Sequence, residues 1–335
     1  MADQTRVPAL TESRDAPGAT GREHDPSIEV RRLTRRFGSF VAVDAISFSV
    51  PAGSIFGLLG ANGAGKSTTI RMLCGLMAPS SGTAVVGGID VAKDPEGVKR
   101  RIGYMSQRFS LYDDLTVEEN IRFFGGVYGL DSRALGRRLE ETVGMAGLGG
   151  KERTLARELS GGWKQRLALG CALLHSPGIV FLDEPTGGTD PLSRRAFWDV
   201  INGLSSRGTT VLVTTHYLDE AEYCNTMVLM HAGRIVAQGS PRELKEHAVS
   251  GAVFEVECAD AVRGMAALRG EPSAVETAMF GTLLHVTVER EEDLPLVLLA
   301  LERAGVAARR SSRIVPSLED VFIRLIDRHD KGARP

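Results

Sequence analysis

The stretch Gly60–Ser67, with the sequence GANGAGKS, constrains the fold more than any other part of the chain. It follows the apolar run Ile55–Leu59, which is typical of a strand, and precedes Thr68–Cys74, which we expect to be helical. Glycines at these spacings let backbone N–H groups converge on an anion at the start of a helix. We therefore predict a phosphate-binding loop in which Lys66 contacts the β- and γ-phosphates of a nucleotide and the Ser67 hydroxyl binds Mg²⁺. A Gly-rich turn without a ligand is the alternative.

Length and composition limit the class of protein. A chain of 335 residues is long enough for two domains, each with its own apolar core. Its 43% hydrophobic and 24% charged residues are typical of a globular protein. The formal net charge of −2 does not support nucleic-acid binding, so we expect no nucleic-acid partner. No window approaches the roughly 18 apolar residues of a membrane span, and there is no secretory signal, so we expect a chain that does not itself cross a membrane.

The predicted elements indicate an α/β domain followed by a smaller α+β domain. Residues 1–26 lack periodicity, which predicts a disordered tail. Over 27–248, strands alternate with helices around the phosphate-binding loop, which predicts a largely parallel sheet, and about 109–176 is mostly helical. Residues 249–328 have the predicted order β-α-β-β-α-β with a terminal helix, typical of a ferredoxin-like sandwich, and 329–335 form a second tail.

Two carboxylates stand at the end of another apolar run, Ile179–Asp183, which is typical of a strand buried on both faces. Ligands bind beyond the carboxyl ends of such strands, so Asp183 can hold Mg²⁺ and Glu184 can polarise an attacking water. A solvated acidic pair at a strand end is the alternative. Beside a complete phosphate-binding loop, the pair predicts the second half of a hydrolytic site.

The segment Leu159–Arg166, LSGGWKQR, combines a hydroxyl, two glycines and an oncoming helix, and so predicts a second anion-binding helix start. One chain rarely needs two such helix starts for one triphosphate. With this segment the sequence resembles the nucleotide-binding subunit of an ABC transporter over about Ile28 to Glu243. The family's motifs occur in its order and approximate spacing: Walker A at Gly60–Ser67, the Q-loop position Gln107, the signature Leu159–Gly162, Walker B at Ile179–Glu184, the D-loop position Asp190 and the switch His216.

The resemblance implies catalytic roles for Glu184, His216, Gln107 and Lys66. Gln107 would reach Mg²⁺ and the attacking water, with a polar strand cap as the alternative. His216 would hold the γ-phosphate and orient Glu184. Phe37 matches the aromatic residue that stacks on adenine, although an ordinary core phenylalanine is the alternative. The residues implied to bind Mg²⁺ are Ser67, Gln107 and Asp183, and those implied to bind ATP are Phe37, Gly60, Asn62, Gly63, Ala64, Gly65, Lys66, Ser67, Thr68, Ser160, Gly161, Gly162 and Asp190.

The resemblance also implies partners. In the family, two cassettes bind head to tail around ATP, so the signature residues of one copy would complete the site of the other. The resemblance therefore implies an ATP-dependent homodimer, bound to a separate integral-membrane permease at the cytoplasmic face of the plasma (inner) membrane. A soluble ABC ATPase acting on nucleic acid or ribosomes and a regulatory module that binds nucleotide without hydrolysis are the alternatives.

Several positions depart from the commonest family pattern. Ala61 stands where many relatives have proline, and Gly187 and Gly188 precede Asp190 in the D-loop. Trp163 after the signature, and the C-terminal block ending in Pro316–Phe322, are similar to the multidrug and antibiotic exporter branch, the daunorubicin-resistance-like ATPases. We therefore expect ATP hydrolysis to drive export of drugs, antibiotics or other hydrophobic compounds.

Overall fold

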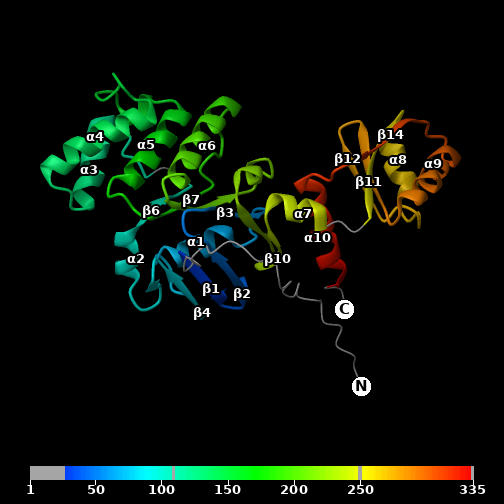
Figure 1. The fold of residues 1–335 in the computed structure, drawn as a ribbon, viewed down its shortest axis with the longest axis horizontal. Helices are drawn as coiled ribbons and strands as arrows, with labels where there is room; N and C mark the ends of the chain where they lie inside the picture. Colours follow the sequence, from blue (N-terminus) through cyan, green and yellow to red (C-terminus); the bar gives the residue numbers. More distant parts are fainter. Residues whose placement is uncertain (1–26, 108–109, 248–250, 333–335) are drawn as a thin grey trace, which may run out of the picture.

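The computed structural model describes residues 27–107, 110–247 and 251–332. The predicted tail at 1–26 lies outside these residues. Figure 1 shows a larger α/β domain, which we call the cassette, beside a smaller accessory domain. None of the helices in the described ranges combines the length and apolar character needed to cross a membrane.

A largely parallel sheet forms the centre of the cassette, with strand order β10-β9-β3-β8-β7-β6. Every neighbouring pair is parallel except β9 and β10, which form an antiparallel hairpin. β3, β7 and β8 are buried at every position, because helices and a second sheet cover both faces. The strands are β3 (Ile55–Gly60), β6 (Ile102–Met105), β7 (Ile179–Asp183), β8 (Thr210–Thr215), β9 (Thr226–His231) and β10 (Arg234–Gly239).

A second, antiparallel sheet packs over helix α1 (Lys66–Leu73) and has the order β2-β1-β4-β5. Residues of both sheets and of α1 share one apolar core, so the helix that begins at the phosphate-binding loop is fixed between two layers. The elements of this layer are β1 (Ile28–Phe37), β2 (Phe40–Val50), β4 (Ser81–Val86), β5 (Ile89–Asp90) and the adjoining helix α2 (Pro95–Arg101).

The segment predicted to be helical is confirmed and forms its own apolar core. Thr116 and Glu119 make a reciprocal capping box at the start of its first helix, as their spacing predicts. Helix α6 packs on the other core of the cassette through its own Phe197 and Trp198. The elements are α3 (Val117–Val127), α4 (Ser132–Ala146), η1 (Ala156–Glu158), α5 (Gly161–Leu173), α6 (Pro191–Ser205) and η2 (Glu220–Tyr223).

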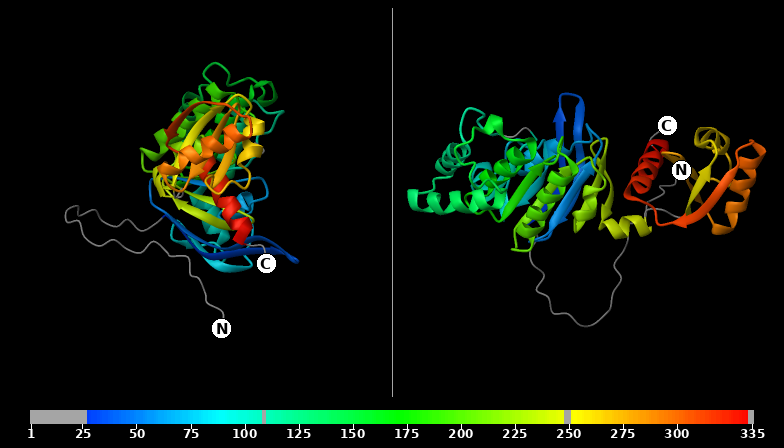
Figure 2. Two further views of the ribbon diagram at one scale, coloured as in Figure 1. Left: turned by 90° about the vertical axis from the view of Figure 1, so that its right-hand side faces the viewer. Right: turned by 90° about the horizontal axis from the view of Figure 1, so that it is seen from above.

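The accessory domain has the predicted β-α-β-β-α-β order and the sheet order β12-β13-β11-β14 of a ferredoxin-like sandwich. Apolar residues of β11 and β13 alternate with polar ones, and one face of the sheet packs on its two longer helices (Figure 2). The elements are β11 (Ala252–Cys258), α8 (Ala261–Leu268), β12 (Glu276–Phe280), β13 (Leu283–Val288), η3 (Glu291–Asp293), α9 (Leu294–Arg303) and β14 (Ala308–Ile314).

The terminal helix α10 (Leu318–Gly332) lies between the two domains, next to α7 (Pro241–His247). Its Leu318 and Val321 are buried in the same core as cassette residues. The predicted tail from residue 329 is therefore wrong in part, because 329–332 continue the helix. α10 has partners in both domains, because Val321 packs in the cassette core and Asp320 contacts His285 of β13.

Candidate active site

The phosphate-binding loop connects β3 to α1 through two glycines that no other residue can replace without strain. Gly65 caps α1 with a left-handed φ of 104°, and a Cβ there would lie 2.6 Å from the Ala42 carbonyl oxygen. Gly60 has φ 152°, and its Cβ would lie 2.3 Å from the Met230 carbonyl oxygen. The backbone therefore turns tightly at both ends of the loop, so that α1 begins at Lys66 with its N–H groups facing the loop.

Lys66 is a buried cation held at the mouth of this loop. Its Nζ donates hydrogen bonds to the carbonyl oxygens of Gly60, at 2.7 Å, and Ala61, at 3.2 Å. It also lies 3.3 Å from Glu184 Oε1, with both side chains less than one tenth exposed. A buried ammonium group requires such partners, and a polyanionic ligand would supply stronger ones.

Asp183 is buried at the carboxyl end of β7 and accepts two hydrogen bonds on Oδ1. The donors are the hydroxyls of Ser67, at 3.0 Å, and Thr214, at 2.7 Å. Burial is the main cause that raises the pKa of Tyr104 to about 12 and the pKa of Cys74 well above its ordinary value. The negative charge of Asp183 is the second cause for both groups. A carboxylate beside a serine hydroxyl fits Mg²⁺, which takes hard oxygen ligands and usually only one or two carboxylates from the protein.

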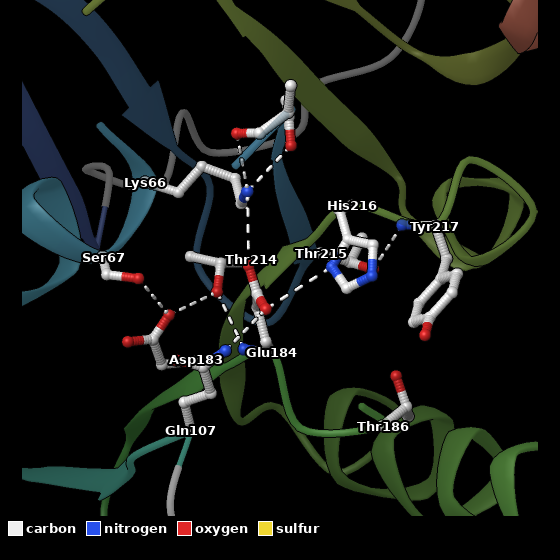
Figure 3. Close-up of polar contacts among 12 residues, drawn as sticks. Lys66, Ser67, Gln107, Asp183, Glu184, Thr186, Thr214, Thr215, His216 and Tyr217 are labelled. Atoms are coloured by element: carbon white, nitrogen blue, oxygen red, sulfur yellow. Dashed lines mark hydrogen bonds and ion pairs between the residues drawn. The ribbon is translucent and has the colours of Figure 1, made fainter. Parts of the chain in front are cut away.

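Glu184 lies where three other predicted catalytic residues meet (Figure 3). Its Oε2 accepts a hydrogen bond from Gln107 Nε2 at 2.9 Å and lies 3.4 Å from His216 Nδ1, while Oε1 faces Lys66. Its backbone has a left-handed φ of 48°, and its N–H donates to Thr214 Oγ1 at 2.8 Å. Such strain in a non-glycine residue persists only where its surroundings impose it, and here it directs the carboxylate toward the phosphate-binding loop.

A cavity of about 420 Å³ opens over these groups, within the usual size range of small-ligand sites. Phe37 is 44% exposed at its rim, which excludes the core-phenylalanine alternative, and the Arg35 guanidinium lies 4.7 Å from its ring centroid. Phe40, which the sequence did not single out, is 63% exposed beside it. The lining consists of Phe37, Phe40, Ala42, Asn62, Gly63, Gly65, Lys66, Ser67, Thr68, Gln107 and Glu184.

The signature residues are not among the described residues that line this cavity. Ser160 and Gly161 are exposed at the start of α5, and Gly162 is packed so closely on α6 that a Cβ would lie 2.6 Å from Ser193 Oγ. Asp190 caps α6 by accepting a hydrogen bond from the Ser193 N–H, and bonds from Ser193 lower the pKa of its carboxyl. Contact of these residues with ATP therefore stays a prediction that requires a second copy of the chain.

Sequence reasoning missed Thr214, which positions both members of the acidic pair. Its hydroxyl donates to Asp183 and accepts from the Glu184 N–H, and it is fully buried. The available signal was a pair of threonines ending the apolar strand before His216. Threonine is common in strands for its β-branched shape, so the sequence alone did not separate a packing role from a hydrogen-bonding one.

Geometry and fold together define a nucleotide-binding cassette with a phosphate-binding loop, and comparisons with known proteins identify its family. Residues 43–187 match the model of the ABC transporter family, and residues 239–326 match that of the C-terminal domain of DrrA1-3-like ATP-binding proteins. The chain is 38% identical to the Nod factor export ATP-binding protein I of Burkholderia lata over 307 residues, which cover 90% of this chain and 97% of that protein. The chain belongs to the ATP-binding proteins of the ABC transporter family, which confirms the resemblance.

Other proteins match the cassette more than the whole chain. The probable multidrug ABC transporter ATP-binding protein YbhF of Escherichia coli is 51% identical over 218 residues, 65% of this chain but only 38% of that protein's length. A solved structure of an ATP-binding subunit of an ABC transporter superposes with a TM-score of 0.60 at 34% identity, covering 65% of this chain and 92% of that one. The cbiO1 structure of Clostridium perfringens gives 0.62 at 26% identity over 67% of this chain and 92% of that one.

Proposed function

We propose that the chain is the ATP-hydrolysing subunit of an ABC exporter. The observation that supports this most directly is the position of Glu184, whose carboxylate contacts Lys66, Gln107 and His216 beside the phosphate-binding loop. A structural acidic pair would not need a strained backbone, a buried lysine and a half-exposed histidine around one carboxylate. All of these groups face the place where the terminal phosphate of a nucleotide would lie.

The chemistry follows from the partners that ATP would replace. Lys66 would exchange its contact with Glu184 for the phosphates, which releases the carboxylate to accept a hydrogen bond from the attacking water. His216 and Gln107 then hold Glu184 and the water in line with the γ-phosphate. Ser67 and Asp183 would hold Mg²⁺, which when bound offsets negative charge on the phosphates. Phe37 offers an exposed ring for stacking on adenine.

We propose further that hydrolysis requires a homodimer arranged head to tail. The exposed Ser160 and Gly161 begin helix α5, whose N-terminal N–H groups favour an anion. Neither is among the described residues that line the cavity of its own chain. If the signature contacts ATP, as the family pattern implies, that ATP must therefore be bound by another copy. A second copy would therefore supply Ser160, Gly161, Gly162 and Asp190 to each site.

We also propose a separate integral-membrane permease as partner, which would place the chain at the cytoplasmic face of the plasma membrane. The support comes from two relatives, a Nod factor export ATP-binding protein and a probable multidrug ABC transporter ATP-binding protein. The match of the C-terminal domain to DrrA1-3-like proteins supports the same branch. The alternative of an ATPase acting on nucleic acid or ribosomes has no support among these proteins.

The substitution Glu184→Gln tests the catalytic assignment. It keeps the shape of the side chain but removes the charge that orients water, so ATP hydrolysis should fall by ~10²–10⁴-fold. ATP binding should persist and the dimer should accumulate, as measured by gel filtration with ATP. Glu96→Gln, on the surface helix α2, is the matched control and should hydrolyse ATP normally. Undiminished hydrolysis by Glu184→Gln would refute the assignment.

The partner assignment is tested by affinity purification of the tagged chain from its native membrane. We expect a polytopic membrane protein to co-purify in stoichiometric amount. Stable association with ribosomes or another translation complex, without such a membrane protein, would contradict an exporter subunit.

A further inference from the structure

The carboxylate of Glu220 is fully buried behind the active site, in the short helix η2 that follows His216 in the chain. One oxygen accepts a hydrogen bond from the hydroxyl of Thr186, and the other accepts from Thr215 Oγ1 at 2.7 Å. Burial of a carboxylate is costly unless it is paired and hydrogen-bonded. Two threonine hydroxyls supply these hydrogen bonds, although Glu220 is not among the described residues that line the proposed ATP cavity.

The two threonines belong to segments that lead to different parts of the proposed site (Figure 3). Thr186 lies between Glu184 and Asp190, and its carbonyl oxygen accepts hydrogen bonds from the N–H and hydroxyl of Thr189. Thr215 ends β8 directly before His216, and its hydroxyl oxygen also accepts from the Tyr217 N–H at 3.0 Å. Both segments are therefore bonded through one carboxylate.

Arg194 makes a second connection between the same segments. It stands in the first turns of α6, the helix that Asp190 caps, and its Nε lies 3.5 Å from Glu220 Oε1. Its guanidinium lies 4.4 Å from the ring centroid of Tyr217 and 3.4 Å from Asp219. A displacement of the start of α6 would thus also move the residues that flank His216.

We infer that Glu220 is a positioning residue that makes the orientation of His216 depend on the position of the D-loop segment Thr186–Asp190. The inference rests on the proposed function, in which that segment meets the second cassette. Arrival of the second copy would shift Thr186 and Arg194, and Glu220 would pass the shift to Thr215 and so to His216. Hydrolysis would then be favoured only when the dimer is closed.

Kinetics of Glu220→Gln test the positioning role. The amide keeps the shape, but its nitrogen cannot accept a hydrogen bond and it carries no charge opposite Arg194. We expect kcat to fall about tenfold or more, the usual range for a group that orients a reacting residue, with KM for ATP unchanged. Glu222→Gln is the matched control, because Glu222 lies in the same short helix but bonds Lys245 at the surface. Unchanged kcat, or a loss of kcat shared by Glu222→Gln, would overturn the inference.

Hydrogen exchange tests the connection without relying on catalysis. In Thr186→Val, which removes one hydroxyl donor to Glu220, amide exchange should accelerate across the site at 215–217. Thr189→Val is the control, because its hydroxyl bonds only within its own loop, and exchange at 215–217 should be unchanged. Equal exchange at 215–217 in wild type and Thr186→Val would overturn the inference. A wild-type protein that fails to hydrolyse ATP would refute the proposed function, while this exchange result would still decide the connection.

Discussion

The two domains each contain a histidine paired with a carboxylate, but the two pairs differ in geometry. In the cassette, His216 Nδ1 lies 3.4 Å from Glu184 Oε2, and the His216 side chain is 33% exposed. In the accessory domain, His285 Nδ1 lies 2.9 Å from Asp320 Oδ1, and both side chains are at most 12% exposed. The histidine–carboxylate distance is therefore longer, and the histidine more exposed, in the cassette than in the accessory domain.

The surroundings explain the difference. Asp320 also accepts hydrogen bonds from the N–H and hydroxyl of Ser317, and Phe280 stacks on the His285 ring at 4.1 Å. These contacts leave the accessory pair little room for a new partner, and they tie β13 to α10. Glu184 instead shares a 2.9 Å hydrogen bond with Gln107 and longer contacts of 3.3 and 3.4 Å with Lys66 and His216 beside a cavity, and such contacts can rearrange when a ligand enters. The surroundings, more than the residue types, therefore distinguish the pair that we propose to be catalytic from the enclosed pair of the accessory domain.

The largest expected effect separates the two histidines by activity. His216→Ala removes a group that holds Glu184, so ATP hydrolysis should fall by ~10²–10⁴-fold while stability changes little. His285→Ala should hydrolyse ATP at the wild-type rate, and each variant is the control for the other. The free energy of unfolding of His285→Ala should instead fall by about 1–3 kcal/mol, because the buried Asp320 loses a hydrogen-bond partner. ATPase assays measure the first effect and urea unfolding of both variants measures the second. Equal losses of ATPase activity in the two variants would contradict the assignment of His216 alone to catalysis.

A smaller effect concerns the pH dependence of stability through a third histidine. Burial lowers the pKa of His175, which stacks on Tyr128 and bonds the Ile102 carbonyl oxygen at 3.0 Å. Since the folded pKa lies below the unfolded value of about 6.5, the unfolded chain binds more protons as the pH falls. The contribution to stability is complete above pH ~6.5 and is lost as the pH falls toward the folded pKa.

Urea unfolding measured at about pH 7.5 and 5.5 checks this point. Wild type should lose more stability on acidification than His175→Gln. If the two proteins lose the same stability on acidification, His175 is not the source of the pH dependence.

Much of the cassette could be predicted because its signals lie close together in the sequence. The phosphate-binding loop Gly60–Ser67 stands between an apolar strand and a helix, and Asp183 and Glu184 directly follow another apolar run. Strand and helix periodicity likewise predicted the ferredoxin-like order of the accessory domain, which the structure confirms. The end of α10 was predicted less well, because residues 327–332 contain no apolar side chain whose periodicity could indicate a helix.

The sequence by itself determined which groups are available to bind a triphosphate: Lys66 and Ser67 in a glycine-bounded loop, and a carboxylate pair ending a buried strand. Only the tertiary structure decided that Thr214 orients that pair and that Glu220 joins Thr186 to Thr215. It also decided which histidine stands open beside a cavity. The physical reason is that the phosphate-binding loop and the acidic pair each consist of residues that are adjacent in the sequence. Burial and hydrogen-bond partners arise instead from segments that meet only when parallel strands bring their carboxyl ends together.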